Sequence, residues 1–319
     1  MATTGIARAG GYADYSSTGT GGQFIPELWS ALLAEKLYPN TVFDSITNRA
    51  WEGEINRLGA IVHIRTQPTL PSSPYQIGQT INYVVPTSTP TQLVIDRARY
   101  WAFQIDTIDM FESDLDLLDV FAQNAAQQLM ADQDVDLLST VYTQFAAANQ
   151  GANAGVKSNS RNLGATGAPL VINPTNVVSS LFLAAKQILD EQNVPFDGRR
   201  YIVLPSNVAA VALASDLKFA YETGDAVSPL RTGYLGTIAN FKVYQSNNVP
   251  TVVDGSVNTQ NVIFGWQPAI AWASQFIDNQ IVKLINQAGW GMRSIVAYGF
   301  NTVNPNFAGF AHVAVGSYT

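Results

Sequence analysis

The sequence predicts an α+β fold, and three observations lead to this class. Between Ala50 and Arg99, strand-forming residues mix with closely spaced prolines, which are tolerated only at sheet edges and in loops. From Ser113 to about Ala148, apolar residues recur at helical spacing without a proline or glycine. Beyond Asn173, amphipathic helical stretches alternate with short apolar strands. The chain therefore combines a β-rich projection, one very long helix and an α/β block.

The N-terminal segment is expected to be an arm. Residues 2–22 are rich in Gly, Ser, Thr and Ala, and such a segment buries too little apolar area to offset its ordering entropy. It is either disordered or ordered against a neighbour. The stretch PELWSALLAEKLYP then predicts a short helix that ends at Pro39.

The next segment predicts a long two-stranded ribbon. The outgoing strand is IVHIR at 61–65, and the returning strand is QLVIDRARYWAFQI at 92–105. The connection between them carries several prolines, yet it also contains the strand formers Ile77, Ile81, Tyr83, Val84 and Val85. An isolated ribbon is only marginally stable in water, so we expect this one to lie on another subunit.

The long helix is expected to begin at Ser113, a favourable N-cap residue. Asp114 and Asp116 would follow in the first turn, where carboxylates interact well with the helix dipole. A helix of about 35 residues would span about 50 Å, which is long for a compact domain.

Local signals also place the later elements. Asn173-Pro174 predicts the N-terminus of a second helix, and Asp197-Gly198 predicts a turn into the strand YIVLP. Ser206 is expected to cap a third helix through Leu213. The apolar segment NVIFGWQPAIAWAS predicts a strand with a bulge or turn at 265–268.

The composition favours self-association and excludes several other classes. Only 13% of the 319 residues are charged, whereas a free monomer of this size usually carries about 25%. The net charge of −7 argues against sequence-specific DNA binding. There are no cysteines, and neither a secretory signal nor a membrane-spanning stretch is visible. Extensive contact with other subunits remains as the way to hide apolar surface.

No motif predicts catalysis, a metal site or a cofactor. Asp132, Asp134 and Asp136 resemble the start of an EF-hand, but the required glycine and final glutamate are missing, so they predict an acidic helix face. His63 and His312 lack metal-ligand spacing and are expected to be structural. Neither a nucleophile elbow nor a phosphate-binding glycine loop occurs.

The order of these segments carries a resemblance, together with three stretches: RRYIVLPSNVAAVALAS, GYLGTIANFKVYQSNNVP and IVAYGFNTVNPNFAGFAHV. From about Phe24 onward the chain resembles the major capsid protein of a tailed bacteriophage with the HK97-type fold, nearer the P22-coat-like branch. The resemblance implies an N-terminal arm at 1–50 and an extended β-ribbon loop at 51–100. It implies a peripheral domain with a spine helix at 101–164, an axial domain at 165–276 and closing peripheral strands at 277–319.

The same resemblance suggests which residues contact other subunits. Gly233 and Gly236 would allow close packing around a symmetry axis, and Asn247 and Asn248 would turn the chain there. The apolar loop residues Ile77, Ile81, Tyr83, Val84 and Val85 are candidates for a contact on the neighbour. Lysines are absent from the loop, so we expect no lysine cross-link of the kind that some members of this fold form.

Charge distribution adds a further expectation. The segment 101–156 contains no Lys or Arg but nine acidic residues, whereas the ribbon is rich in arginine. One interpretation is a solvated acidic helix. Another pairs the ribbon with the acidic region of a neighbour, and a third places the acidic face inside the shell, where it would repel DNA. The residues of the second interpretation are Arg57, Arg65, Arg97 and Arg99, opposite Asp114, Asp116 and Asp119.

The resemblance therefore predicts a shell protein without an active site or cofactor. It would form hexamers and pentamers of itself, enclose double-stranded DNA without reading its sequence, and assemble in the bacterial host cytoplasm into the virion. A portal and a separate scaffolding protein are expected partners, with a decoration protein as an option. The alternatives are an encapsulin-like nanocompartment shell and, from another class, a soluble α+β enzyme or binding protein.

Overall fold

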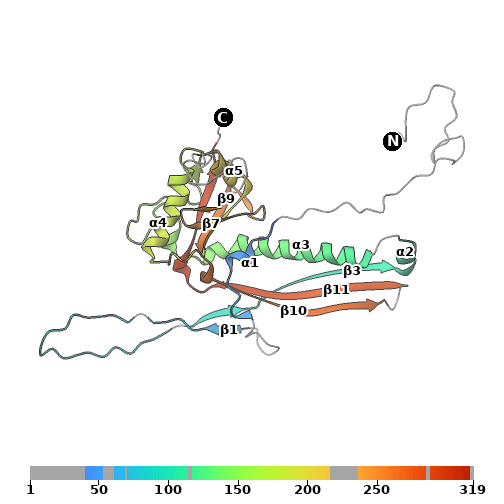
Figure 1. Cartoon of the computed structure of the whole chain (residues 1–319), viewed down its shortest axis with the longest axis horizontal. Helices are drawn as coiled ribbons and strands as arrows, with labels where there is room; N and C mark the ends of the chain where they lie inside the picture. The colour runs from blue at the N-terminus through green and yellow to red at the C-terminus, as the bar shows by residue number, and fades with distance from the viewer. Residues whose placement is uncertain are drawn as a thin grey trace, which may run out of the picture.

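The computed structural model describes residues 40–52, 61–68, 70–88, 90–113, 117–215, 236–284 and 288–316. The arm before residue 40, including the helix expected to end at Pro39, lies outside these ranges. Within them, a larger and a smaller sheet carry the fold, and one long helix runs beside the smaller sheet (Figure 1).

The helices and strands have the following bounds. The N-terminal half contains α1 Phe43–Ile46, β1 Ile61–Ile64, β2 Thr91–Val94, β3 Arg97–Asp106, α2 Thr107–Glu112, α3 Leu117–Thr140 and β4 Leu170–Ile172. The C-terminal half contains α4 Leu183–Glu191, β5 Arg200–Leu204, α5 Ser206–Ala214, β6 Thr237–Ile238, β7 Phe241–Gln245, β8 Thr251–Asp254, β9 Val257–Trp266, β10 Ile270–Lys283, β11 Gly289–Thr302 and β12 Ala308–Val315.

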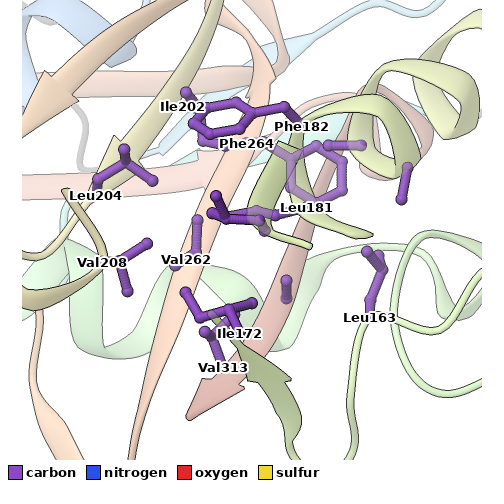
Figure 2. Close-up of a cluster of buried hydrophobic side chains, with 14 of the residues drawn as sticks. Leu163, Ile172, Leu181, Phe182, Ile202, Leu204, Val208, Val262, Phe264 and Val313 are labelled. Carbon is purple, nitrogen blue, oxygen red and sulfur yellow. The ribbon is translucent and has the colours of Figure 1, made fainter. Parts of the chain in front are cut away.

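The larger sheet forms the body of the molecule. Its strand order is β4-β12-β9-β5-β7-β6, with β8 paired to β9. The strand pairs β4–β12 and β5–β7 are parallel, and the others are antiparallel. Figure 2 shows the core between this sheet and the helices, where the strands contribute Ile172, Ile202, Leu204, Val262, Phe264 and Val313, and the helical segments contribute Leu181, Phe182 and Val208.

The expected N-terminus of the second helix is confirmed. Oδ1 of Asn173 accepts hydrogen bonds from the backbone N–H groups of Thr175 at 3.0 Å and Asn176 at 3.1 Å. The helix continues through a π-helical turn, Val178–Phe182, into α4. The turn at Gly198, with φ of 73°, and the turn between β9 and β10 at Gln267–Ala269 are also as expected.

The smaller sheet has three antiparallel strands in the order β10-β11-β3. We call this sheet the arm from here on; it is not the N-terminal segment before residue 40. The spine helix α3 lies along this arm (Figure 1), where Phe121 of α3 packs edge-on against Phe103 of β3 with ring centroids 5.8 Å apart. Strands β10 and β11 each have 14 residues, so together with α3 they form one elongated unit beside the body.

The predicted ribbon was too long, because its returning strand is divided between two sheets. Only β1 and β2 pair with each other, over four residues each. Residues Arg97–Asp106 instead pair with β11 from Tyr298 to Gly289, nearly 200 residues later in the chain. A partner so distant leaves no signal in the local alternation of residues.

The predicted helix was also too long. Ser113 is the C-cap residue of α2, where its backbone N–H bonds to the carbonyl oxygen of Asp109, and α3 is described from Leu117 onward, so the expected cap at Ser113 stays a prediction. The helix α3 ends at Thr140, and a 3-10 turn follows at Val141–Gln144. Both Ser139 and Thr140 donate their hydroxyl groups to the carbonyl oxygen of Asp136, a local bond that competes with continued helix.

The expected closing strands at 277–319 belong to two different sheets. The strand β10 already begins at Ile270, and β12 leaves the arm to pair with β4 and β9 in the body. A side chain at Gly309 of β12 would overlap the carbonyl oxygen of Asn149 and the ring of Phe264, so the strand can lie this close only with glycine there. This insertion ties the C-terminal strand to the body core.

A second hydrophobic cluster, which we call the junction, lies where the arm meets the body. It contains residues of α1, α3, β5, β10 and β11. Its largest side chain, Trp272, is fully buried and stacks on Tyr298 and Phe300 at centroid distances of 5.2 and 5.8 Å. The junction thereby fixes the arm to the body.

Candidate subunit-contact surfaces

Among the described residues, the two most exposed large apolar side chains, Ile77 and Tyr83, lie on the extended loop, which we define as residues 65–90 between β1 and β2. The loop projects past the body on the side opposite the end of the arm (Figure 1). Tyr83 is 93% exposed and Val85 81%, and Ile77, Ile81 and Val84 are exposed as well. None of the five belongs to a hydrophobic cluster of the described residues. The loop therefore presents a row of apolar groups to the outside.

Few hydrogen bonds shape the extended loop. At its far turn the backbone N–H of Gln79 bonds to the carbonyl oxygen of Gln76 at 3.0 Å, next to Gly78 with φ of 87°. Near its base the hydroxyl of Ser88 contacts Thr66. A side chain at Gly299 of β11 would overlap the carbonyl oxygen of Val94, so the base of the loop rests on the arm.

The four candidate arginines divide into three groups. Arg57 lies outside the described residues. Arg65 is exposed at the start of the loop, and no described acidic group lies within ion-pair distance of it. Arg97 and Arg99 are on β3, not on the ribbon, and they face the helix α3 of their own chain. These two arginines therefore have acidic partners within their own chain, and their contact with a neighbour stays a prediction.

The partners of Arg97 and Arg99 belong to the acidic sequence 132–136. A guanidinium nitrogen of Arg97 lies 2.6 Å from Oδ1 of Asp136, and one of Arg99 lies 3.9 Å from Oδ2 of Asp132. The hydroxyl of Tyr298 also donates to Asp136 at 2.8 Å, and burial raises the pKa of Tyr298. Two of the three carboxylates thus fasten the spine helix to the arm.

The third carboxylate, Asp134, is fully buried, which contradicts the predicted solvated acidic face. Its Oδ1 accepts hydrogen bonds from the backbone N–H groups of Val42 at 3.1 Å and Phe43 at 2.8 Å, at the start of α1. Its Oδ2 accepts from Nδ2 of Asn248 at 2.7 Å and lies 3.3 Å from the hydroxyl of Ser246. Burial raises the pKa of Asp134 although these hydrogen bonds oppose the shift.

The carboxylate of Asp134 explains why Ser246 and Asn248 are polar, since both donate hydrogen bonds to it. The resemblance instead implies a place for Asn247 and Asn248 at a symmetry axis between copies. Asn248 is buried against Asp134 inside one chain. Asn247 is exposed, and its side-chain oxygen accepts from the hydroxyl of Ser206, the first residue of α5, whose N-cap is Pro205 and not Ser206. Asn248 therefore links the body to the spine helix within one chain through Asp134, and a role at a symmetry axis stays a prediction.

The remaining candidates have mixed outcomes. Gly236 has a positive φ of 58°, a conformation that glycine adopts without steric cost, and its contact around an axis stays a prediction. Gly233, Asp114 and Asp116 lie outside the described residues. Asp119 is exposed in the first turn of α3 and accepts a hydrogen bond from Gln123 at 2.8 Å.

A second exposed apolar surface, which sequence reasoning missed, lies at the far end of the arm. We call it the tip, and it comprises α2 and the adjoining ends of α3, β10 and β11. Phe111 is 90% exposed and Ile108 64%, beside the acidic Asp109 and Glu112. A cleft of about 680 Å³ opens there between Asp106, Phe121 and Leu284. The available signal was the pattern TIDMFE, in which apolar and acidic residues alternate within one short helix.

The structure also bears on metal binding and membrane insertion. Within the described ranges no three or more His, Asp or Glu side chains are grouped so that they could hold a metal ion. Of the helices that the structure describes, none is long and apolar enough to cross a membrane. His63 lies in β1 opposite Gln92, and His312 lies in β12 opposite Asn261.

Neither a family model nor a curated protein matches this sequence. Solved structures do match it over nearly the whole length of both chains. A structure from Mycobacterium phage Che8 has a TM-score of 0.69 at 23% identity, covering 92% of this chain and 97% of the other. A capsid structure of the cyanophage P-SCSP1u has a TM-score of 0.68 at 12% identity, covering 97% and 98%.

The chain has the HK97-type capsid fold. The mature capsid of bacteriophage PhiM1 agrees, with a TM-score of 0.66 at 12% identity over 92% of this chain and 93% of the other. Identities this low mean that the likeness concerns the fold.

Proposed function

We propose that this chain is the major capsid protein of a tailed phage and assembles into an icosahedral head shell around double-stranded DNA. The observation that carries the proposal is the extended loop, whose apolar side chains project from the body and join no hydrophobic cluster of the described residues. Such a surface is costly in water unless another molecule covers it. The HK97-type fold makes further copies of this chain the natural cover.

The proposal gives each part of the chain a place in the shell. The body with the seven-stranded sheet surrounds the centres of hexamers and pentamers, and the extended loop lies over the arm of an adjacent copy. The function is carried by these repeated contacts, and no catalytic step is needed. A portal, a separate scaffolding protein and a decoration protein are the further partners that such a virion shell, assembled in the host cytoplasm, would take.

Charge complementarity supports the position of the loop. Arg65 is exposed at the loop base, while the tip carries Asp109, Glu112 and Asp119 without a neighbouring Lys or Arg in the sequence 101–156. We infer that Arg65 of one copy meets the acidic tip of the next. Such pairs set register more than affinity, and salt screens them. The acidic surface that stays uncovered inside would repel packaged DNA.

Reversal of the charge at Arg65 tests this contact. Arg65→Glu should slow shell formation at low salt, because like charges then face each other across the contact, and added salt should reduce the defect. Light scattering during assembly measures the rate, with Arg65→Gln as the matched variant that removes charge without reversing it. Assembly of Arg65→Glu at the wild-type rate in low salt would contradict the pairing.

Electron microscopy of the purified chain tests the function itself. We expect closed shells, tubes or capsomers, visible directly in negative stain. A small closed shell loaded with an enzyme would favour the encapsulin-like alternative. A monomer with the extended loop folded onto its own body would overturn the proposal and favour a soluble enzyme or binding protein.

A further inference from the structure

A cavity of about 400 Å³ lies in the body beside the β8–β9 hairpin. Its walls come from β8, from Asn261 of β9, from Phe310 and His312 of β12, from the 3-10 turn after α3, and from the two loops that contain Gly151 and Gly164. Protein pockets that bind small molecules have volumes of about 300–1,000 Å³. The cavity is therefore large enough for a small organic ligand, and the shell contacts proposed above do not use it.

Three polar side chains form one wall. Two of them, His312 and Asn261, are buried on paired strands, and a ring nitrogen of His312 lies 2.7 Å from Oδ1 of Asn261. The other ring nitrogen lies 3.2 Å from Oδ2 of Asp254. The same Oδ2 accepts the backbone N–H of Gly167 at 2.6 Å. These bonds hold the carboxylate of Asp254 in one orientation, and its Oδ1 accepts no hydrogen bond from the described residues.

Two aromatic rings also line the cavity. Tyr142 and Phe310 both line the cavity, and their ring centroids are 4.9 Å apart at an interplanar angle of 56°. The amide of Gln150 also lines it, and its Nε2 is already bonded to the carbonyl oxygen of Phe145. This leaves the amide oxygen of Gln150 as a second acceptor. No Lys or Arg is among the described residues that line the cavity.

We propose that this cavity binds a small organic ammonium ion, such as a primary amine or diamine. An oriented carboxylate supplies the counter-charge, aromatic faces attract organic cations, and an amide oxygen accepts a further N–H. An anionic ligand would face Asp254, and no lysine or arginine lines the cavity to balance it; His312, already bonded to Asp254, is the one described lining residue that could carry a positive charge. A bare metal ion is disfavoured because only one carboxylate lines the cavity, and the described residues hold no group of three metal-binding side chains.

The test is a calorimetric titration of the purified protein with putrescine, compared with butane-1,4-diol of the same length. We expect saturable binding of putrescine with one site per chain, and none of the diol. Asp254→Asn keeps the shape and an acceptor for Gly167, and it should weaken putrescine binding by about tenfold or more, since it removes the only charge that pairs with the ligand. Phe310→Leu should also weaken binding, because it removes an aromatic face.

The control must separate this site from general attraction to an acidic protein. Asp44→Asn removes one equal charge from an exposed carboxylate of α1 that does not line the cavity, and it should leave the affinity unchanged. Equal affinity in Asp254→Asn and wild type, equal binding of the diol, or no saturable binding at millimolar putrescine would each overturn the proposal. The shell function does not depend on the outcome, because the cavity and the extended loop share no residue.

Discussion

Shell formation should be lost when Tyr83 and Val85 of the extended loop are both replaced by serine. Burial of a large apolar side chain contributes about 1.5–3 kcal/mol, so the double change removes roughly 3–6 kcal/mol from every loop contact. Each 1.4 kcal/mol is a factor of ten in affinity, which makes the loss at least about a hundredfold per contact. Because both side chains are exposed within the chain, the fold itself should be unaffected.

Size-exclusion chromatography with electron microscopy measures the assembly, and circular dichroism confirms that the variant is folded. Asn82→Gln is the matched control, since Asn82 is exposed between Ile81 and Tyr83 and the change keeps it polar. The control should assemble like the wild type. Shells of normal size and yield from the double variant would show that the loop side chains do not hold neighbouring copies together.

The second large effect is expected at Asp134, whose removal should destabilise the fold by roughly 3 kcal/mol. Asp134→Ala leaves the backbone N–H groups of Val42 and Phe43 and the amide of Asn248 buried without their acceptor. Each buried polar group left unpaired costs about 1–3 kcal/mol, and the sum is reduced because a buried charge is also removed. Urea unfolding of the unassembled chain, in the Tyr83/Val85 serine background, measures the difference.

A matched control for this change is Asp132→Ala on the same helix. Asp132 is partly exposed and lies 3.9 Å from Arg99, so its loss should cost less than about 1 kcal/mol. Equal destabilisation by the two variants would contradict the special role of Asp134.

The pH dependence of stability should also distinguish Asp134. Its pKa is raised in the folded chain, so the fold holds a proton there more tightly than the unfolded chain does. The stability that this group contributes is therefore complete below its ordinary pKa of 3.8 and is lost as pH rises through the raised value. Asp134→Asn keeps the Oδ1 acceptor and cannot titrate, so it should remove this part of the slope. An unchanged slope in urea midpoints from pH 7 down to the ordinary pKa of 3.8 would show that Asp134 does not titrate differently in the fold.

Features that depend on neighbours in sequence were predictable. The cap at Asn173, the turn at Gly198 and the break between β9 and β10 each require particular residue types at adjacent positions, and all three are present. The exposed apolar loop was predictable for a related reason. Prolines keep the segment out of a sheet interior, so its strand-forming side chains have no core of their own to enter.

Features that depend on distant partners were not predictable. The local sequence predicts that Arg97 belongs to the ribbon. In the structure its strand, β3, pairs with β11, and this pairing places Arg97 beside Asp136. The sequence 132–136 reads as a solvated acidic face because a charge occurs at every second position. The middle carboxylate, Asp134, is buried by residues 42–43 and 246–248, which lie about 90 and 110 positions away in the sequence. No local pattern in those residues indicates that they bind a carboxylate.

The length of β11 has a mechanical consequence. Fourteen extended residues at about 3.3 Å each span about 46 Å. The N-terminal end of β11 lies at the tip, and near its C-terminal end Tyr298 and Phe300 stack on Trp272. A swing of about 5° at those rings would displace the far end by about 4 Å, roughly the spacing between adjacent strands. In the proposed shell, small rearrangements of packing around one tryptophan would thus suffice to change the local curvature.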